Sequence, residues 1–134
     1  MCGVVGLLRI SASAPHLNLS ALADEMSYTL THRGPDANGV WTDEAQGVAF
    51  GHRRLSIIDL SSAGAQPMVS ASGRYVLTYN GELYNHQALR VKLEKVGFHF
   101  AGTSDTEVLL GAIEHYGLKQ ALGHLVGMYA LALW

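Results

Sequence analysis

The first ten residues constrain the fold most, because an apolar run rich in strand-forming residues begins at the N-terminus itself. They read Met-Cys-Gly-Val-Val-Gly-Leu-Leu-Arg-Ile, a composition typical of a buried strand. Chain ends usually fray, but a strand inside a sheet is held by its neighbours. We therefore expect an ordered N-terminus, with Cys2 at the start of a core strand.

The segment after this strand predicts one helix followed by short strands. Apolar side chains recur at helical spacing over residues 19–30, and the following Gly34-Pro35 stops a helix. Three short strands are expected next, at residues 40–42, 47–51 and 54–58. A loop is expected over residues 61–67.

The middle of the chain predicts a strand and a helix on either side of an Asn-Gly pair. Residues 74–79 have the composition of a strand, which Asn80-Gly81 is expected to break. Asn85 could cap a following helix that ends at Gly97.

The last part of the chain predicts one more helix and one more strand. Ser104-Asp105-Thr106-Glu107 has the spacing of a capping box, and Gly117 supplies the helix end. Residues 128–134 resemble a buried strand that is cut off at the chain end. Single strands and hairpins between helices favour an α+β or layered α/β architecture, and we expect residues 1–134 to form one domain.

Composition and charge exclude several classes of protein. The chain has 134 residues, of which 49% are hydrophobic and 15% charged, which fits one globular domain. A net charge of −2 and scattered basic residues argue against a nucleic-acid partner. No apolar run approaches the roughly 18 to 20 residues that cross a bilayer, and the N-terminus lacks the basic region of a signal peptide. We expect no membrane association and a cytoplasmic location.

The histidines and the cysteine could carry chemistry. The seven histidines show no paired helical spacing with a nearby acid, so no metal site is expected. Cys2 is the only cysteine and cannot form an internal disulfide, so it is a small buried side chain, a stray thiol or a reactive group. Removal of Met1 would give Cys2 a free α-amine, whose pKa of roughly 7.7 to 8.0 suits it to accept the thiol proton.

Six strings together resemble the class II glutamine amidotransferase domain of glutamine-hydrolysing asparagine synthetases. They are Cys2-Gly3, His32-Arg33-Gly34-Pro35-Asp36, Gly51-His52-Arg53-Arg54-Leu55-Ser56-Ile57-Ile58-Asp59, Gln66-Pro67, Asn80-Gly81-Glu82-Leu83-Tyr84-Asn85-His86 and Ser104-Asp105-Thr106-Glu107. Each string alone is weak, but six in the family's order are specific. Arg-Gly-Pro-Asp favours the asparagine synthetase branch, including its polysaccharide-associated relatives. The resemblance implies a four-layer αββα fold of the N-terminal-nucleophile type, C-terminally incomplete in this chain.

The same resemblance implies the catalytic residues. Cys2 is the implied nucleophile, and the Asn80 side chain and the Gly81 N–H are the implied oxyanion donors. Glycine at the second position lets the backbone approach the substrate. Residues 32–36 are expected to shape a loop over the pocket, which Arg33 could order through carboxylates.

The resemblance further implies the residues that bind L-glutamine. Arg54 is expected to bind the α-carboxylate, and Arg53 faces the other side of an extended segment. A surface salt bridge is the alternative role for Arg54. Asp105 is expected to bind the α-ammonium, although an acid in the first turn of a helix is favoured by the helix dipole whatever its function. The other implied contacts are Leu55, Ser56, Ile57, Ile58, Asn80, Gly81 and Glu82.

The implied reaction is the glutaminase half of an asparagine synthetase. A Cys2 thioester would form with release of ammonia and then be hydrolysed to glutamate. In the family the ammonia reaches an ATP-activated aspartate in a C-terminal ATP-pyrophosphatase domain, which uses ATP and Mg. The phosphate loop of that domain is absent from this chain, so no cofactor is expected here. A missing β segment would expose sheet edges and favour a homo-oligomer or a partner that completes the fold.

Three alternatives stay open from the sequence. The ammonia could pass to another acceptor, such as a polysaccharide-associated sugar. The chain could be a noncatalytic module that binds glutamine. It could also be a fragment that only preserves a fold.

Overall fold

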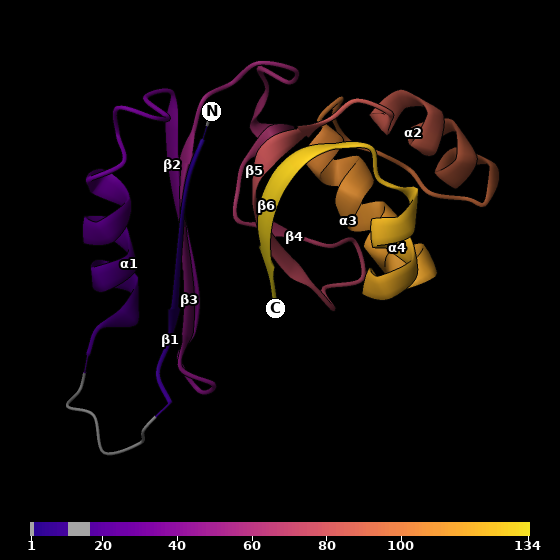
Figure 1. The fold of residues 1–134 in the computed structure, drawn as a ribbon. Coiled ribbons are helices and arrows are strands. Elements are labelled where there is room, and N and C mark those ends of the chain that lie inside the picture. The colour runs from indigo at the N-terminus through magenta and orange to yellow at the C-terminus, as the bar shows by residue number, and fades with distance from the viewer. Residues whose placement is uncertain (1, 11–16) are drawn as a thin grey trace.

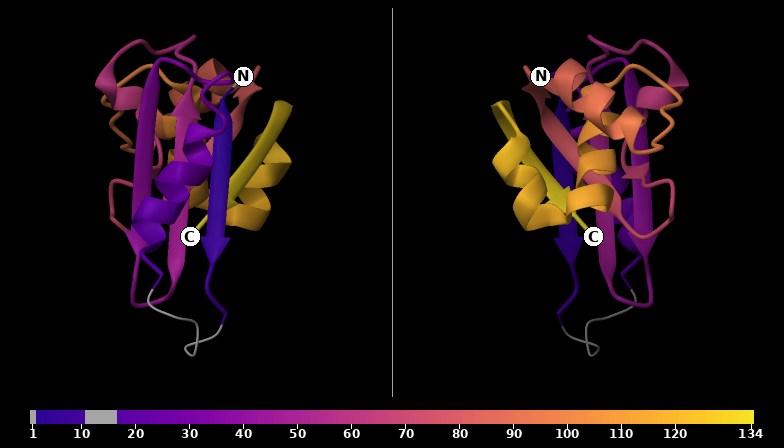
Figure 2. Two further views of the ribbon diagram at one scale, coloured as in Figure 1. Left: turned by 90° about the vertical axis from the view of Figure 1, so that its left-hand side faces the viewer. Right: turned by 90° about the vertical axis from the view of Figure 1, so that its right-hand side faces the viewer.

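The computed structural model describes residues 2–10 and 17–134, and its elements stack in four layers (Figure 1). The outer helix α1 (Leu19–Tyr28) covers a sheet of β1 (Gly3–Leu8), β2 (Ala37–Asp43) and β3 (Val48–Arg54). A second sheet follows, made of β4 (Met68–Val69), β5 (Val76–Leu83) and β6 (Gly127–Leu133). The last layer contains α2 (His86–Lys95), α3 (Asp105–Tyr116) and α4 (Leu118–His124). The predicted αββα arrangement is confirmed, and Figure 2 shows the helix layers from both outer sides.

The first sheet brings the N-terminus to the end of β3. Its order is β1-β3-β2, and both pairings are antiparallel. Gly3 pairs with Arg53, so Cys2 lies beside the point at which β3 ends. The predicted first strand is confirmed from Gly3 onward, and Met1 lies outside the described residues.

The prediction of a separate strand at residues 54–58 is wrong. β3 runs without interruption from Val48 to Arg54, and the segment after it makes no ladder. The amides of this segment bind side chains from elsewhere in the chain: Leu55 N–H contacts the thiol of Cys2, and Ser56 N–H donates to a carboxylate oxygen of Asp36 at 2.7 Å. These two N–H groups are thus taken by side chains and not by a neighbouring strand.

The prediction that Asn80-Gly81 ends the strand of residues 74–79 is also wrong. β5 continues to Leu83, because β6 pairs with it from Leu77 to Leu83. The strand that stabilises this part of β5 lies far along the sequence, so the local Asn-Gly pattern could not reveal it. The Asn-Gly pair therefore lies within β5, opposite β6, and not in a turn.

The helices follow their sequence signals with two exceptions. Asn18 caps α1 through its side chain, and Ser104 caps α3 by accepting a hydrogen bond from Glu107 N–H. Asn85 precedes α2 but makes no side-chain cap; its amide instead binds His124 O and Val126 N–H. The short helix α4 was not predicted. None of the described helices is long and apolar enough to cross a membrane.

Three apolar clusters and one polar contact hold the layers together, and one of the clusters joins the two sheets through Val48, Phe50 and Val76. The largest cluster packs α2, α3 and α4 against β5 and includes Leu77, Leu83 and Ile113. A smaller one packs α1 against the first sheet. Between the sheets, Nε2 of the buried His52 contacts the backbone oxygen of Tyr79 at 3.1 Å. This contact fixes β3 relative to the part of β5 that precedes Asn80.

Candidate active site

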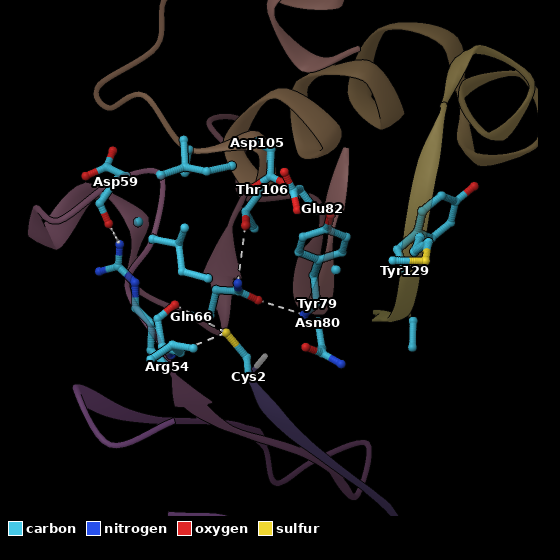
Figure 3. Close-up of a pocket in the computed structure, with 18 residues that line it drawn as sticks. Cys2, Arg54, Asp59, Gln66, Tyr79, Asn80, Glu82, Asp105, Thr106 and Tyr129 are labelled. Atoms are coloured by element: carbon cyan, nitrogen blue, oxygen red, sulfur yellow. Dashed lines mark hydrogen bonds between the residues drawn. The ribbon is translucent and has the colours of Figure 1, made fainter. Parts of the chain in front are cut away.

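A cavity of about 510 Å³ contains nearly all of the residues that the sequence analysis assigned to a site (Figure 3). Its walls come from the residue before β1, the end of β3 and the segment after it, the middle of β5, the start of α3, and β6. The assigned residues in these walls are Cys2, Arg54, Leu55, Ile57, Ile58, Asn80, Gly81, Glu82 and Asp105. Ser56 does not line the cavity.

Cys2 is held from two sides. Its Sγ lies 3.4 Å from Leu55 N and 3.7 Å from Leu55 O, so both polar groups of that residue face the thiol. Arg33 Nε donates to the carbonyl oxygen of Cys2 at 3.1 Å. The expectation that Arg33 orders its loop through carboxylates is thereby corrected, because its guanidinium binds the backbone of Cys2. Residues 32–36 do not line the cavity, so they do not form the loop over the pocket that the sequence analysis expected.

The N–H of Gly81 is directed away from β6. Val76 and Trp134 exchange both backbone hydrogen bonds, and antiparallel pairs alternate between bonded and non-bonded. The register therefore makes Gly81 and Tyr129 a non-bonded pair. On the free edge of β5, Tyr79 N–H and Leu83 N–H are taken by side chains, whereas no described residue accepts the Gly81 N–H. A donor without a partner thus faces the cavity.

The side-chain amide of Asn80 is also without a partner. It makes no hydrogen bond to any residue in the described ranges, and its Oδ1 is buried. Buried amides are normally satisfied, so an unused amide beside a thiol is a group that a ligand can engage. Asn80 and Gly81 together offer two neighbouring donors.

Arg54 supplies an uncompensated positive charge at one end of the cavity. Its guanidinium donates to the backbone oxygens of Ser61, at 2.7 Å, and Asp59. No described carboxylate lies within ion-pair distance of it. A Cβ on Gly64 would collide with this guanidinium, so the glycine makes room for it. Arg53 points elsewhere and donates to Gly34 O at 3.2 Å.

Asp59 stabilises the loop that holds Arg54. Ser61 donates to one carboxylate oxygen through both its hydroxyl and its N–H, and Thr103 N–H donates to the other at 2.7 Å. The hydroxyl of Ser61 and these backbone donors hold the pKa of Asp59 well below its ordinary value. Its carboxylate is therefore ionised, and both of its oxygens accept hydrogen bonds from Ser61 and Thr103.

Asp105 supplies an uncompensated negative charge in the same cavity. It is the first residue of α3, only 6% exposed, and no basic side chain of the described residues pairs with it. Its Oδ2 accepts hydrogen bonds from Tyr79 Oη at 2.9 Å and from Leu83 N–H at 3.0 Å. A cavity that contains an unpaired guanidinium and an unpaired carboxylate suits a ligand that carries both charges.

A buried polar network supports β5 behind these groups. Gln66 accepts a hydrogen bond from Tyr79 N–H at 2.7 Å and donates to Thr106 Oγ1 at 3.2 Å. Burial lowers the pKa of His52 to about 4, and the nearby charge of Arg54 acts in the same direction. His52 is therefore neutral at pH 7, and its bond to a carbonyl oxygen requires the proton on Nε2.

Acidification from pH 7 to pH 5 should lower the free energy of unfolding by about 2 kcal/mol through His52. The folded pKa is about 4 and the ordinary value 6.5, so the unfolded chain binds more protons between these limits and acid favours unfolding. Urea titrations at both pH values measure this loss. His52→Gln should reduce it, and His99→Gln, which changes an exposed histidine, should not. The account is wrong if His52→Gln keeps the full wild-type loss.

Several residues of the cavity were not assigned a role from the sequence. They are Asp59, Gly64, Gln66, Tyr79, Ser104, Thr106, Met128, Tyr129 and Ala130. Gln66 and Asp59 stand within recognised strings, so their presence was visible but their role was not. Tyr79 directly precedes the Asn-Gly pair and has no local pattern that distinguishes it from a core tyrosine. Within residues 2–10 and 17–134, no cluster of three or more His, Cys, Asp or Glu could hold a metal ion.

Comparison with known proteins matches the chain to one family and to relatives whose names agree with that family. A family model described as a glutamine amidotransferase domain matches residues 1–134. The glutamine-hydrolysing asparagine synthetase 1 of Bacillus subtilis (strain 168) is 42% identical over 134 residues, which are 100% of this chain and 21% of that protein. Asparagine synthetase B of Escherichia coli (strain K12) is 40% identical over 134 residues, 100% of this chain and 23% of the relative.

A fungal relative and a solved structure extend the comparison. Amidase chry2 of Gibberella zeae is 38% identical over 141 residues, 100% of this chain and 21% of that protein. The glutamine phosphoribosylpyrophosphate amidotransferase of B. subtilis, complexed with ADP and GMP, superposes with a TM-score of 0.74 at 25% identity, over 98% of this chain and 34% of that one. The chain spans about a fifth of the length of the curated relatives it matches.

Proposed function

Because the chain belongs to the glutamine amidotransferase domain family, we propose that it hydrolyses L-glutamine to glutamate and ammonia through a thioester on Cys2. One observation carries the proposal most directly. A single cavity contains a thiol, two unused hydrogen-bond donors, a buried guanidinium and a buried carboxylate, and neither of these two charged groups has an ion-pair partner among the described residues. Free glutamine has a matching group for each of them.

The two charges select a free amino acid. Arg54 has donors left on its guanidinium beyond the two backbone contacts, and these can bind an α-carboxylate. Asp105 can accept a hydrogen bond from the α-ammonium through Oδ1. A glutamine residue within a protein has neither charge, so this pair of contacts excludes it. Leu55, Ile57 and Ile58 form the wall along the substrate chain, with Glu82 next to the oxyanion donors.

The chemistry begins with removal of the Cys2 thiol proton. Once Met1 is removed, the α-amine of Cys2 accepts this proton directly or through water. Sγ then attacks the side-chain amide carbon, and the negative charge on the oxygen is stabilised by Asn80 Nδ2 and Gly81 N–H. Collapse of this intermediate breaks the C–N bond, and the transferred proton leaves with ammonia. Water then hydrolyses the thioester to glutamate and regenerates the thiol.

Two residues are assigned a positioning role in this scheme. Arg33 fixes the carbonyl of Cys2 and so orients the thiol toward the cavity. The N–H of Ser56 is engaged by Asp36 outside the cavity, so Ser56 holds the wall segment in place and makes no assigned contact with substrate.

In the whole protein, we propose that the ammonia passes to an ATP-activated aspartate in a C-terminal ATP-pyrophosphatase domain. The support is the names of the relatives, which are glutamine-hydrolysing asparagine synthetases of which this chain spans 21% and 23%. ATP and Mg²⁺ would be held by that other domain. We also propose a cytoplasmic location. A different acceptor, such as a sugar, is the alternative.

The assay that tests the proposal compares L-glutamine with D-glutamine. The chain should release glutamate and ammonia in equal amounts from L-glutamine and little from the D isomer, because inversion at Cα separates the ammonium from Asp105. Glutamine binding without any release would select the noncatalytic module instead. If the chain neither binds nor hydrolyses L-glutamine, the proposal is wrong.

A further inference from the structure

We propose that the hydroxyl of Tyr79 is a specificity-determining group, which makes the site require an α-amino group on its substrate by fixing the carboxylate of Asp105. This inference rests on the function proposed above. Tyr79 lies immediately before the oxyanion residue Asn80, and both Tyr79 and Asp105 line the cavity (Figure 3).

Both protein hydrogen bonds to Asp105 end on the same oxygen. Tyr79 Oη and Leu83 N–H donate to Oδ2, at 2.9 and 3.0 Å, and no described residue donates to Oδ1. Two donors on one oxygen fix the rotation of the carboxylate about its side-chain bonds. The other oxygen is thereby left to accept a hydrogen bond from the ligand, in an orientation set before binding.

The hydroxyl of Tyr79 has no other described partner. Tyr79 is 2% exposed, and Asp105 is the one acceptor that the described residues offer to its hydroxyl. Burial raises the pKa of Tyr79 above its ordinary value, with the charge of Asp105 acting in the same direction. The hydroxyl therefore keeps its proton and donates it to the carboxylate at every physiological pH.

The backbone of Tyr79 is fixed as firmly as its side chain. Its N–H donates to Gln66 Oε1, and its carbonyl oxygen accepts a hydrogen bond from His52 Nε2. Tyr79 thus positions both the carboxylate of Asp105, which binds the α-ammonium, and the adjacent Asn80, which donates to the oxyanion. A substrate that engages Asp105 is held with its side-chain amide at a fixed distance from Asn80.

Loss of the Tyr79 hydroxyl should weaken only the binding of the α-amino group of the substrate. Without it, Asp105 loses a donor and its carboxylate can rotate, so the contact with the α-ammonium weakens. Glutaramic acid has the same carboxylate and side-chain amide as glutamine but lacks the α-amino group. Hydrolysis of glutaramic acid does not use the contact with Asp105, so its rate depends only on the other contacts of the site.

The test compares these two substrates in Tyr79→Phe. The ratio of kcat/KM for L-glutamine to that for glutaramic acid should fall about tenfold, mainly through KM for glutamine, because a hydrogen bond to a charged group is lost. Because both substrates are measured on the same sample, any loss of folded protein cancels from the ratio. Tyr75→Phe is the matched control, since the Tyr75 hydroxyl bonds to no described residue, and it should keep the wild-type ratio.

A binding measurement covers the case of weak turnover. Protection of Cys2 from alkylation by iodoacetamide gives apparent dissociation constants for both compounds, and Tyr79→Phe should weaken protection by glutamine about tenfold relative to glutaramic acid. An unchanged ratio in both measurements would overturn the inference and leave the hydroxyl a purely structural group. Absence of hydrolysis in the wild type would instead count against the proposed function, and the protection ratio would still decide the role of Tyr79.

Discussion

Replacing Cys2 by alanine should lower the rate of glutamine hydrolysis by at least about 10⁴-fold, because the nucleophile is lost and no other thiol exists in the chain. Alanine is also small enough for Met1 to be removed, so the N-terminus of the variant matches that of the wild type. Glutamate release under saturating glutamine measures the effect. Glutamine binding should persist, since Arg54 and Asp105 are unchanged.

The role assigned to the α-amine gives this prediction a second arm. A chain that keeps Met1, or carries one added residue before Cys2, retains the thiol but has an amide nitrogen in place of the amine. An amide nitrogen does not accept a proton near neutral pH, so this chain should be inactive as well. Hydrolysis at the wild-type rate by the alanine variant would show that Cys2 is not the nucleophile, and full activity with Met1 retained would remove the amine from the mechanism.

Replacing Asn80 by alanine should lower kcat by about 10²- to 10³-fold, the usual cost of removing one oxyanion donor. The amide contacts no described residue, so its loss does not break a hydrogen bond of the fold. KM should change much less, because the oxyanion forms only after substrate has bound. Steady-state measurements of glutamate release give both constants.

Asn85→Ala is the matched control for this variant. Asn85 lies in the same segment, but its amide binds His124 O and Val126 N–H outside the cavity. This change should destabilise the link between α2 and β6 and leave kcat near the wild-type value. A kcat for Asn80→Ala within a few-fold of the wild type would exclude Asn80 from stabilisation of the oxyanion.

The parts of the fold that were predicted correctly depend on local patterns. β1 follows from its composition, α1 from apolar spacing and the Gly-Pro stop after it, and α3 from its capping box and the glycine at its end. The two wrong strand predictions concern segments whose hydrogen bonds are made by distant residues. Residues 55 and 56 give their N–H groups to Cys2 and Asp36, and Asn80-Gly81 is kept extended by β6. A local pattern carries no information about such partners.

In the site, too, local sequence patterns predicted some features, and features that depend on distant residues were missed. The strings that resemble the family identified residues that the structure places around one cavity, with Ser56 the exception. The charge balance was not predictable, because it depends on which acidic and basic side chains form ion pairs. The carboxylate of Asp59 is occupied by hydrogen bonds from Ser61 and from the distant Thr103, so Arg54 stays uncompensated. The role of Tyr79 was likewise invisible, since its partners Gln66, His52 and Asp105 are dispersed through the chain.

The central claim is that the thiol of an N-terminal Cys2 reacts within a pocket for free glutamine. An electrophilic analogue of L-glutamine, followed by mass analysis of the N-terminal peptide, tests it most directly. We predict one label on Cys2 of chains that lack Met1, prevented by excess L-glutamine and not by D-glutamine. Failure to label Cys2 in chains that lack Met1, or labelling that L-glutamine does not prevent, would contradict the account.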